Sequence, residues 1–324
     1  VESPAGAVSA VTEAIRTARE HPQGPVRVGI PKDVLASRTP QTTPSIREPA
    51  APPEPDPQAV DTAGTVLRKS TAPVVIAGGG VRRSGATAQL RAIAERLDAP
   101  VVTTYKGKGV LPETHPLSAG VLCGGASTEL RTLLAEADVG LVVGSDLDAV
   151  ATAKWSVSMP ETLVHVTLDG DDVGFAYETD LGVVADAGRF LTALDERLTG
   201  DDALREEPTS PGEARAAAVR EADRGRFSAI AADRDEGAPL RSVEVLDTVR
   251  EVLPSEAVVT ADAGGFRLWT LVSFPAAGPT AYVNPGSWAT MGTGLPAAIG
   301  AKLATPDREV VALTGDGGLM MCIH

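Results

Sequence analysis

The sequence is poor in aromatic residues and in cysteine. Aromatic side chains make up only 3% of its 324 residues, so its cores have to be built from Ala, Val, Leu and Ile. Its two cysteines, Cys123 and Cys322, stand far apart and form no Cys-x-x-Cys or Cys/His spacing, which argues against a zinc site. Separated cysteines of this kind are typical of free thiols in a cytoplasmic protein, and that location is our expectation.

Long apolar runs and an excess of positive charge are also missing. No apolar stretch reaches the roughly 20 residues that span a bilayer, and the first residues do not resemble a secretory signal, so we expect no membrane association. The 43 acidic residues outnumber the 29 basic ones, which gives a formal net charge of −14. A surface with this charge would be repelled by phosphates, so we expect no nucleic-acid partner.

Proline content and charge divide the chain into five predicted segments. These are the tail of one domain (1–36), a Pro-rich linker (37–60), an α/β domain (61–198), a charged linking arm (199–240) and the start of a further α/β domain (241–324). Within the first segment, helical spacing covers residues 3–20, and residues 26–30 are predicted to form a short strand.

Strands and helices alternate in both α/β segments. The stretches "PVVIAG", "APVVTT" and "VGLVVG" are continuous apolar runs, and helical spacing separates them, with helices expected at 59–69, 84–97 and 127–136. Continuous apolar strands indicate a parallel sheet with both faces covered. The predicted fold class is therefore α/β, with two doubly wound, Rossmann-like sheets, the second truncated after three strands, and the tail of a third unit. We expect flanking sequence to supply the missing parts.

Three glycine-containing turns follow predicted strands, at residues 78–80, 264–265 and 315–318. In doubly wound sheets, ligands bind outside the carboxyl ends of the strands, and glycines there let the backbone approach a phosphate. A Gly-Asp-Gly sequence alone is more often a simple turn. At the end of a strand, however, Asp316 is placed to share a Mg²⁺ ion with a diphosphate.

The stretch "GSWATMGTGLPAAIGAKLA", followed by "REVVALTGDGG", resembles the diphosphate-binding domain of thiamine-diphosphate enzymes of the acetolactate synthase group. "GPVRVGIPKDV" resembles the end of that family's pyrimidine-binding domain, and residues 78–198 resemble its central domain. The resemblance implies thiamine diphosphate and Mg²⁺ as cofactors. It implies Asp316 as a metal ligand and Gly264, Gly265, Ala289, Met291, Gly317 and Gly318 as cofactor-binding residues. Without that context, Met291 would be read as a core methionine.

Some members of the group also bind FAD in the central domain. The matching positions that survive are Gly78, Gly79, Gly80, Thr104, Asp169 and Asp186. The family's Gly-x-Arg-Phe-Asp-Asp-Arg pattern, however, is "GSDLDAV" here, so both arginines are absent and Asp146 stands in the place of one. An acidic residue there would repel a flavin diphosphate, so FAD binding stays open, and the turn at 78–80 is also explained without a ligand. A Gln-His pair of the synthases is Gly265-Phe266 here.

The resemblance implies a decarboxylase and carboligase that acts on a 2-oxo acid such as pyruvate, as a homodimer or homotetramer. A benzoylformate-type decarboxylase, another thiamine-diphosphate lyase or oxidase, and a non-catalytic fragment remain as alternatives. The family's catalytic Glu and the last residue of its metal motif lie outside this sequence, so we nominate no catalytic residue.

Overall fold

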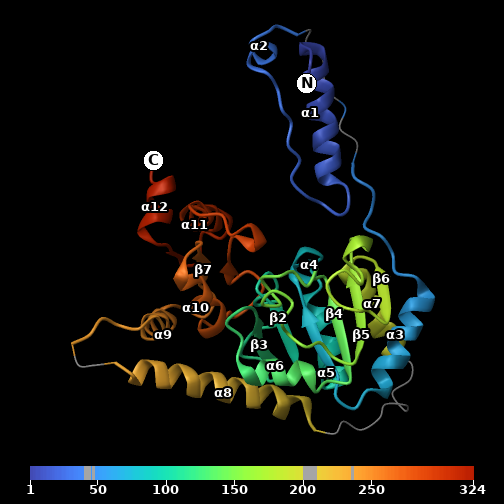
Figure 1. Cartoon of the computed structure of the whole chain (residues 1–324), viewed down its shortest axis with the longest axis vertical. Helices are drawn as coiled ribbons and strands as arrows, with labels where there is room; N and C mark the ends of the chain where they lie inside the picture. The colour runs from blue at the N-terminus through green and yellow to red at the C-terminus, as the bar shows by residue number, and fades with distance from the viewer. Residues whose placement is uncertain (40–44, 46–47, 200–209, 235–236) are drawn as a thin grey trace. The chain divides into compact units, whose positions relative to one another are not determined.

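The computed structural model describes residues 1–39, 45, 48–199, 210–234 and 237–324 (Figure 1). Parts of the predicted linker and of the predicted arm, residues 40–44, 46–47, 200–209 and 235–236, lie outside the described residues. By its internal contacts the chain divides into two compact units, residues 1–53 and residues 54–324.

The first unit contains helices α1 (Pro4–Arg19) and α2 (Lys32–Leu35). Helix α1 was expected, and it starts after Ser3, whose hydroxyl oxygen accepts a hydrogen bond from the Gly6 N–H. The strand predicted over residues 26–30 is wrong, because these residues have no regular structure. A β-branched run becomes a strand only beside a partner, and the described residues of this unit provide none.

The second unit is built around a parallel sheet in the order β3–β2–β1–β4–β5–β6. Its strands are β1 (Val74–Ala77), β2 (Val101–Thr104), β3 (Ser118–Leu122), β4 (Val139–Val143), β5 (Thr162–Thr167) and β6 (Leu181–Val184). This order is that of a doubly wound Rossmann-like sheet, which confirms the predicted fold class. Strand β3 was not predicted, since "SAGVL" lacks the β-branched run that marks the other strands.

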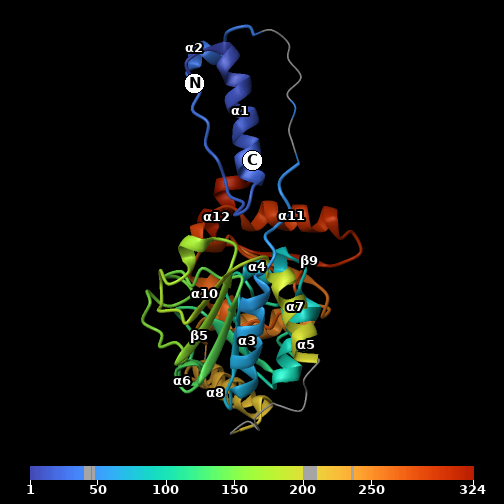
Figure 2. The same ribbon diagram turned by 90° about the vertical axis from the view of Figure 1, so that its right-hand side faces the viewer.

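Helices cover both faces of this sheet (Figures 1 and 2). One face carries α3 (Pro57–Lys69), α5 (Thr87–Leu97) and α7 (Ala187–Thr199), and the other carries α6 (Thr128–Ala135) and α8 (Gly212–Ala232). Alternate residues of β1 belong to the two cores: Val75 and Ala77 pack with the first helix layer, and Val74 and Ile76 with the second. Burial on both faces explains why the strands are apolar without alternation. Short helix α4 (Gly79–Arg83) follows β1, so the helix predicted from residue 84 begins only at Thr87.

Helix α8 belongs to the predicted linking arm, and its arginines fasten it to the first sheet. Arg215, Arg220 and Arg226 each donate hydrogen bonds to main-chain carbonyls, which are those of Ala72, Pro73, Pro116, Ser118 and Gly125, at 2.6–3.3 Å. Ala216 and Val219 of the same helix are buried against that sheet. The arm is therefore a docked helix in its described part.

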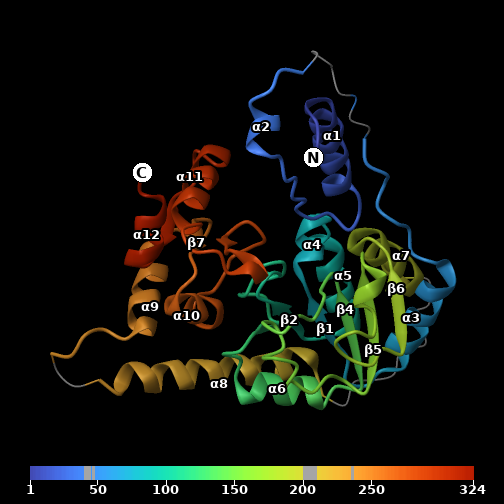
Figure 3. The same cartoon turned by 45° about the horizontal axis from the view of Figure 1, so that its top comes forward.

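The second sheet is parallel and has the order β8–β7–β9. It consists of β7 (Val258–Ala261), β8 (Tyr282–Val283) and β9 (Val310–Leu313). The helices α9 (Ser242–Val252), α10 (Gly265–Ser273), α11 (Gly294–Ala304) and α12 (Asp316–Cys322) surround it (Figure 3). Two short 3₁₀ helices also occur in the second unit, η1 (Gly170–Asp172) and η3 (Gly286–Trp288). No helix in the described part of the chain is long and apolar enough to cross a membrane.

A buried ion pair within the first sheet's domain contacts the main chain of the second sheet's domain. The ammonium of Lys108, in the connection between β2 and β3, is fully buried and donates to both carboxylate oxygens of Glu113 at 2.7 and 2.8 Å. It also donates to the main-chain carbonyl of Leu271 in α10 at 3.0 Å. Around this pair, Tyr105 and Val121 share one apolar cluster with residues of the second sheet's domain.

Candidate functional site

The turns that follow β7 and β9 meet at the carboxyl edge of the second sheet. Parallel strands end at the same edge, so the predicted residues Gly264 and Gly265, after β7, lie beside residues 315–318, after β9. The loop of residues 284–293, which follows β8, reaches the same place: a Cβ on Gly292 would lie 3.0 Å from Cβ of Met321 and 3.5 Å from the Gly318 carbonyl. The structure thus brings the predicted cofactor-binding residues to one edge of one sheet.

Asp262 organises this edge, and the sequence did not single it out. Its side chain is fully buried at the end of β7 and accepts hydrogen bonds from the backbone N–H groups of Ala263 (2.7 Å), Gly292 (3.0 Å) and Thr293 (3.3 Å). The hydroxyl of Thr314, just before the Gly-Asp-Gly turn, donates to it at 3.2 Å. One carboxylate therefore ties the 284–293 loop and the β9 turn to the end of β7. The signal was present, since an acidic residue follows an apolar strand and only Ala263 separates it from two glycines.

The glycines of the edge fall into two kinds. A Cβ on Gly318 would lie 2.5 Å from the Asp262 carboxylate, and a Cβ on Gly264 would lie 2.6 Å from the Phe266 ring, so these positions need glycine for close packing. A Cβ on Gly265 or Gly317 would meet nothing within 4 Å. At these two positions the space beside the Cα atom is therefore not filled by other described residues.

Ala289 and Met291 lie on the 284–293 loop. Ala289 has φ +46°, in the left-handed region, which is uncommon for a residue other than glycine and occurs often at functional sites. Met291 is 57% exposed and lies before α11, which begins at Gly294, so it is not a core methionine of this chain. Both residues are therefore accessible to a ligand at this edge.

Asp316 is the first residue of α12 and is exposed. Its carboxylate accepts a hydrogen bond from the Gly317 N–H at 2.8 Å. Within the described ranges, no group of three or more His, Cys, Asp or Glu side chains could hold a metal ion. A Mg²⁺ ion at Asp316 would therefore draw its remaining ligands from phosphate and water oxygens, which is how Mg²⁺ is usually bound.

The glycine turn of the first sheet, Gly78–Gly80, is packed against the turn that follows β4. The N–H of Gly78 donates to the Val143 carbonyl, and that of Gly80 donates to the Gly144 carbonyl, both at 2.9 Å. A Cβ on Gly78 would lie 2.1 Å from the Gly144 oxygen, and one on Gly80 would lie 2.6 Å from the Gly144 Cα. The close approach of two backbones explains these two glycines, and their N–H groups are already used.

Acidic residues surround this turn. Lys106 forms ion pairs with Asp146 (2.7 Å) and Asp148 (3.2 Å), and Asp148 also accepts a hydrogen bond from the Tyr105 hydroxyl. Burial raises the pKa of Asp172, and the charges of Asp146 and Asp169 contribute in the same direction. Lys106 is thus shared between two carboxylates, and additional negative charge is disfavoured here.

The remaining positions considered for FAD mostly have local roles. The Asp169 carboxylate accepts from the Asp171 N–H and starts η1. The Asp186 carboxylate accepts from the N–H groups of Gly188 and Arg189 at the start of α7. Thr104 differs, because its hydroxyl is buried and finds no hydrogen-bond partner among the described residues.

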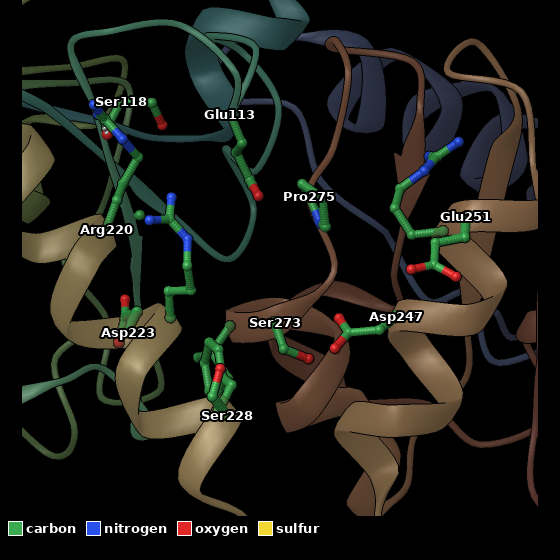
Figure 4. A pocket seen from close by; sticks show the side chains of 14 residues that line it. Glu113, Ser118, Arg220, Asp223, Ser228, Asp247, Glu251, Ser273 and Pro275 are labelled. Atoms are coloured by element: carbon green, nitrogen blue, oxygen red, sulfur yellow. Dashed lines mark hydrogen bonds between the residues drawn. The ribbon is translucent and has the colours of Figure 1, made fainter. Parts of the chain in front are cut away.

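A separate cleft of about 430 Å³ lies between α8, α9 and α10 (Figure 4). Asp223 and Ser228 of α8 line one wall, and Asp247 and Glu251 of α9 line the other, together with arginines of both helices. None of the predicted site residues lines this cleft. Its mixed charge does not select one ligand, and it is distinct from the carboxyl edge of the second sheet.

Comparison with protein families gives two matches. The family described as "Thiamine pyrophosphate enzyme, central domain" matches residues 60–194, which contain the six-stranded sheet. The family described as "Thiamine pyrophosphate enzyme, C-terminal TPP binding domain" matches residues 262–324, from Asp262 to the end of the chain. Thiamine pyrophosphate and thiamine diphosphate are the same molecule.

Curated proteins align with almost the whole chain. Acetolactate synthase isozyme 1 large subunit of Escherichia coli is 32% identical over 97% of the chain and 54% of its own length. Acetolactate synthase large subunit of Lactococcus lactis is 31% identical over 96% and 53%. Probable 2-ketoarginine decarboxylase AruI of Pseudomonas aeruginosa is 33% identical over 91% and 50%. The chain spans about half the length of the curated relatives it matches.

Proposed function

Because the chain belongs to the thiamine pyrophosphate enzyme family, we propose that the complete protein uses thiamine diphosphate and Mg²⁺ to decarboxylate a 2-oxo acid and transfer the remaining fragment to an acceptor. Pyruvate is the first substrate to test, because the curated relatives include acetolactate synthases. The observation that carries the proposal is the edge organised by Asp262, where the predicted cofactor-binding residues meet inside the region that matches the TPP-binding domain.

The residues at this edge suit a diphosphate and its metal. Gly265 and Gly317 carry no side chain that would crowd the phosphate oxygens, and Asp316, which accepts a hydrogen bond from the Gly317 N–H, would hold Mg²⁺. Ala289 and Met291 would contact the ring portion of the cofactor from the 284–293 loop. When bound, thiamine diphosphate supplies the carbanion chemistry that allows a 2-oxo acid to lose CO₂. We assign no acid–base catalyst to this chain.

The test is ThDP-dependent turnover by the complete protein. Purified protein freed of cofactor should gain activity on pyruvate only when thiamine diphosphate and Mg²⁺ are both added. CO₂ release and acetolactate formation should be measured together. Failure to bind thiamine diphosphate at millimolar concentration would support the alternative of a non-catalytic protein.

Simple decarboxylation is the second candidate, and two observations favour it. One relative of comparable identity is a probable 2-ketoarginine decarboxylase. In addition, Phe266 stands where the resemblance places a histidine, and its ring lies 3.8 Å from the Cβ position of Gly315. An aldehyde product without carboligation, measured over a panel of 2-oxo acids, would support this reading, as it would for a benzoylformate-type enzyme.

We also propose that the central domain binds no flavin. The N–H groups of Gly78 and Gly80 already donate to backbone carbonyls, and Asp146 with its acidic neighbours would repel a flavin diphosphate. The complete protein, purified from riboflavin-supplemented cells, should lack flavin absorbance near 450 nm and should not be stabilised against heat by FAD. Stoichiometric bound FAD, held in part by the unpaired Thr104 hydroxyl, would refute this.

Finally, we propose a homodimeric or homotetrameric protein of the cytoplasm. Large apolar side chains are exposed on the second sheet's domain, including Trp288 (86%), Leu303 (79%) and Met320 (66%). Burial of these side chains against a second copy would stabilise an oligomer. Light scattering of the complete protein would measure its oligomeric state, and a monomer at micromolar concentration would contradict the proposal.

A further inference from the structure

Arg267 is a buried cation at the edge of the second sheet, and its environment is unusual. It belongs to the first turn of α10, two residues after Gly265, and its side chain is only 9% exposed. Among the described residues no Asp or Glu lies within ion-pair distance of its guanidinium, and its Nε has no hydrogen-bond partner. A buried charge without a counter-charge is costly, so its retention calls for a role.

The contacts of Arg267 point to the 284–293 loop. One guanidinium N–H donates to the Gly286 carbonyl at 2.8 Å, and the same nitrogen lies 3.5 Å from the Asn284 side-chain oxygen. Asn284 in turn accepts from the Gly286 N–H at 3.0 Å and donates to the main-chain carbonyl of Tyr105 at 3.0 Å. The guanidinium also lies over the Tyr105 ring, 5.4 Å from its centre.

The loop therefore has two anchors. Asp262 holds its end through the N–H groups of Gly292 and Thr293, and Arg267 holds its beginning at Gly286. Ala289 and Met291 lie between the anchors, and Ala289 donates its own N–H to the carbonyl of Gly286 that Arg267 contacts. A shift of Gly286 would thus be transmitted directly to Ala289.

We propose that Arg267 is a positioning residue for cofactor binding: it fixes the 284–293 loop, which carries Ala289 and Met291, against Tyr105 of the central domain. The proposal rests on the proposed use of thiamine diphosphate. Tyr105 is itself held by the hydrogen bond from its hydroxyl to Asp148, so in this proposal the central domain supports the 284–293 loop.

The experiment compares three variants of the complete protein. Arg267→Met keeps the length of the side chain but removes its donors and charge, whereas Arg267→Lys keeps the charge and loses the planar fork. Arg250→Met is the matched control, because Arg250 likewise stacks on an aromatic ring (Phe274, 5.3 Å) and donates to main-chain carbonyls, but those carbonyls belong to Leu253 and Pro254.

Two measurements are made on each variant. The first is hydrogen exchange of residues 284–293 in cofactor-free protein, which reports loop opening without any ligand. The second is the affinity for thiamine diphosphate with Mg²⁺, followed by tryptophan fluorescence. Arg267→Met should exchange faster and bind at least about tenfold more weakly, which is the loss expected for one charge-assisted hydrogen bond. Arg267→Lys should be intermediate, and Arg250→Met should match the unsubstituted protein in both.

Loop exchange and affinity of Arg267→Met within twofold of the unsubstituted protein would overturn the proposal. If Arg267→Met does not fold, Arg267→Lys and Asn284→Ala decide, since each should speed exchange of the loop in a folded protein, and the absence of any increase in both would overturn it. Failure of the unsubstituted protein to bind thiamine diphosphate would instead count against the proposed function, and the exchange measurement would still test the anchoring role.

Discussion

Replacing Asp262 should lower the stability of the second sheet's domain, because this one carboxylate accepts hydrogen bonds from several segments. Four donors point at this carboxylate, namely the N–H groups of Ala263, Gly292 and Thr293 and the hydroxyl of Thr314. A buried donor left without a partner costs about 1–3 kcal/mol. Since Gly292, Thr293 and Thr314 are only partly buried, water can satisfy some of them, so we expect Asp262→Ala to lower the free energy of unfolding by about 3 kcal/mol. Asp262→Asn keeps one acceptor oxygen and should lose about half as much.

The positions of the three tryptophans allow the unfolding of the second sheet's domain to be followed separately. Two of the three, Trp269 and Trp288, lie in the second sheet's domain, and the third, Trp155, lies in the first and is half-exposed. In a Trp155→Phe background, guanidinium unfolding followed by tryptophan fluorescence reports on the domain of interest. Asp138→Ala is the matched control, because Asp138 accepts hydrogen bonds from the Ser70 hydroxyl and from the Thr71 and Ala72 N–H groups in the first sheet's domain.

The pH dependence provides a second check. Burial by itself would raise the pKa of Asp262, but the hydrogen bonds from Ala263, Thr314 and their neighbours outweigh it, so the pKa lies below its ordinary value. The stabilisation is then complete above the unfolded-state pKa of about 3.9 and is lost as the pH falls through the lower folded-state pKa. The difference between the Asp262 variants and the unsubstituted protein should stay constant from about pH 5 to 8 and shrink below about pH 4. A loss under about 0.5 kcal/mol at pH 7, or an equal loss for Asp138→Ala, would refute the role given to Asp262.

Three further outcomes are expected. Asp316→Asn and Asp316→Ala should fold normally but bind thiamine diphosphate and Mg²⁺ at least about tenfold more weakly, with Asn the milder; full activity of the Asn variant at limiting Mg²⁺ would reject the ligand role. Lys108→Met or Glu113→Leu alone should destabilise by about 3–5 kcal/mol, and the double variant by much less; additive losses in the thermodynamic cycle would contradict a coupled pair. Burial lowers the pKa of His165, so as the pH falls below about 6.5 the unfolded chain binds the proton first and the free energy of unfolding should decrease. In denaturant titrations, His165→Gln should reduce this dependence of stability on pH. An unchanged dependence would exclude His165 as its source.

The sequence was sufficient where one local pattern decides the outcome. The run "PVVIAG" has to be a buried strand because both of its faces carry apolar residues, and helices do cover both. The alternation of such runs with helical spacing predicted the doubly wound sheet, and the motif around Gly315 located the candidate site. Local patterns failed for strand β3, which was missed, and for residues 26–30, which were wrongly predicted as a strand. Whether such a segment forms a strand depends on the presence of a pairing partner more than on its composition.

The supporting residues of the site were beyond local patterns. Asp262 reads as a turn residue until the structure shows that its donors come from two distant segments, 292–293 and 314. Arg267 reads as a polar residue of an amphipathic helix, and only the packing of Tyr105 over it shows that it is buried. At Gly78 and Gly80 the sequence left a ligand site and a simple turn both open, and the close approach of the Gly144 backbone accounts for these two glycines without a ligand.

Helix α8 depends on an unusual kind of contact, with consequences for behaviour in salt. Its arginines Arg215, Arg220 and Arg226 donate to main-chain carbonyls, which carry no net charge. Mobile ions screen the attraction between exposed opposite charges, but they have little effect on a short hydrogen bond to a neutral, partly buried oxygen. Helix α8 should therefore stay packed on the first sheet at ionic strengths that weaken surface ion pairs such as Arg224–Glu221. The chain has a net charge of −14, so added salt would also reduce the repulsion between its acidic residues. We therefore expect the stability of the protein to increase with salt concentration.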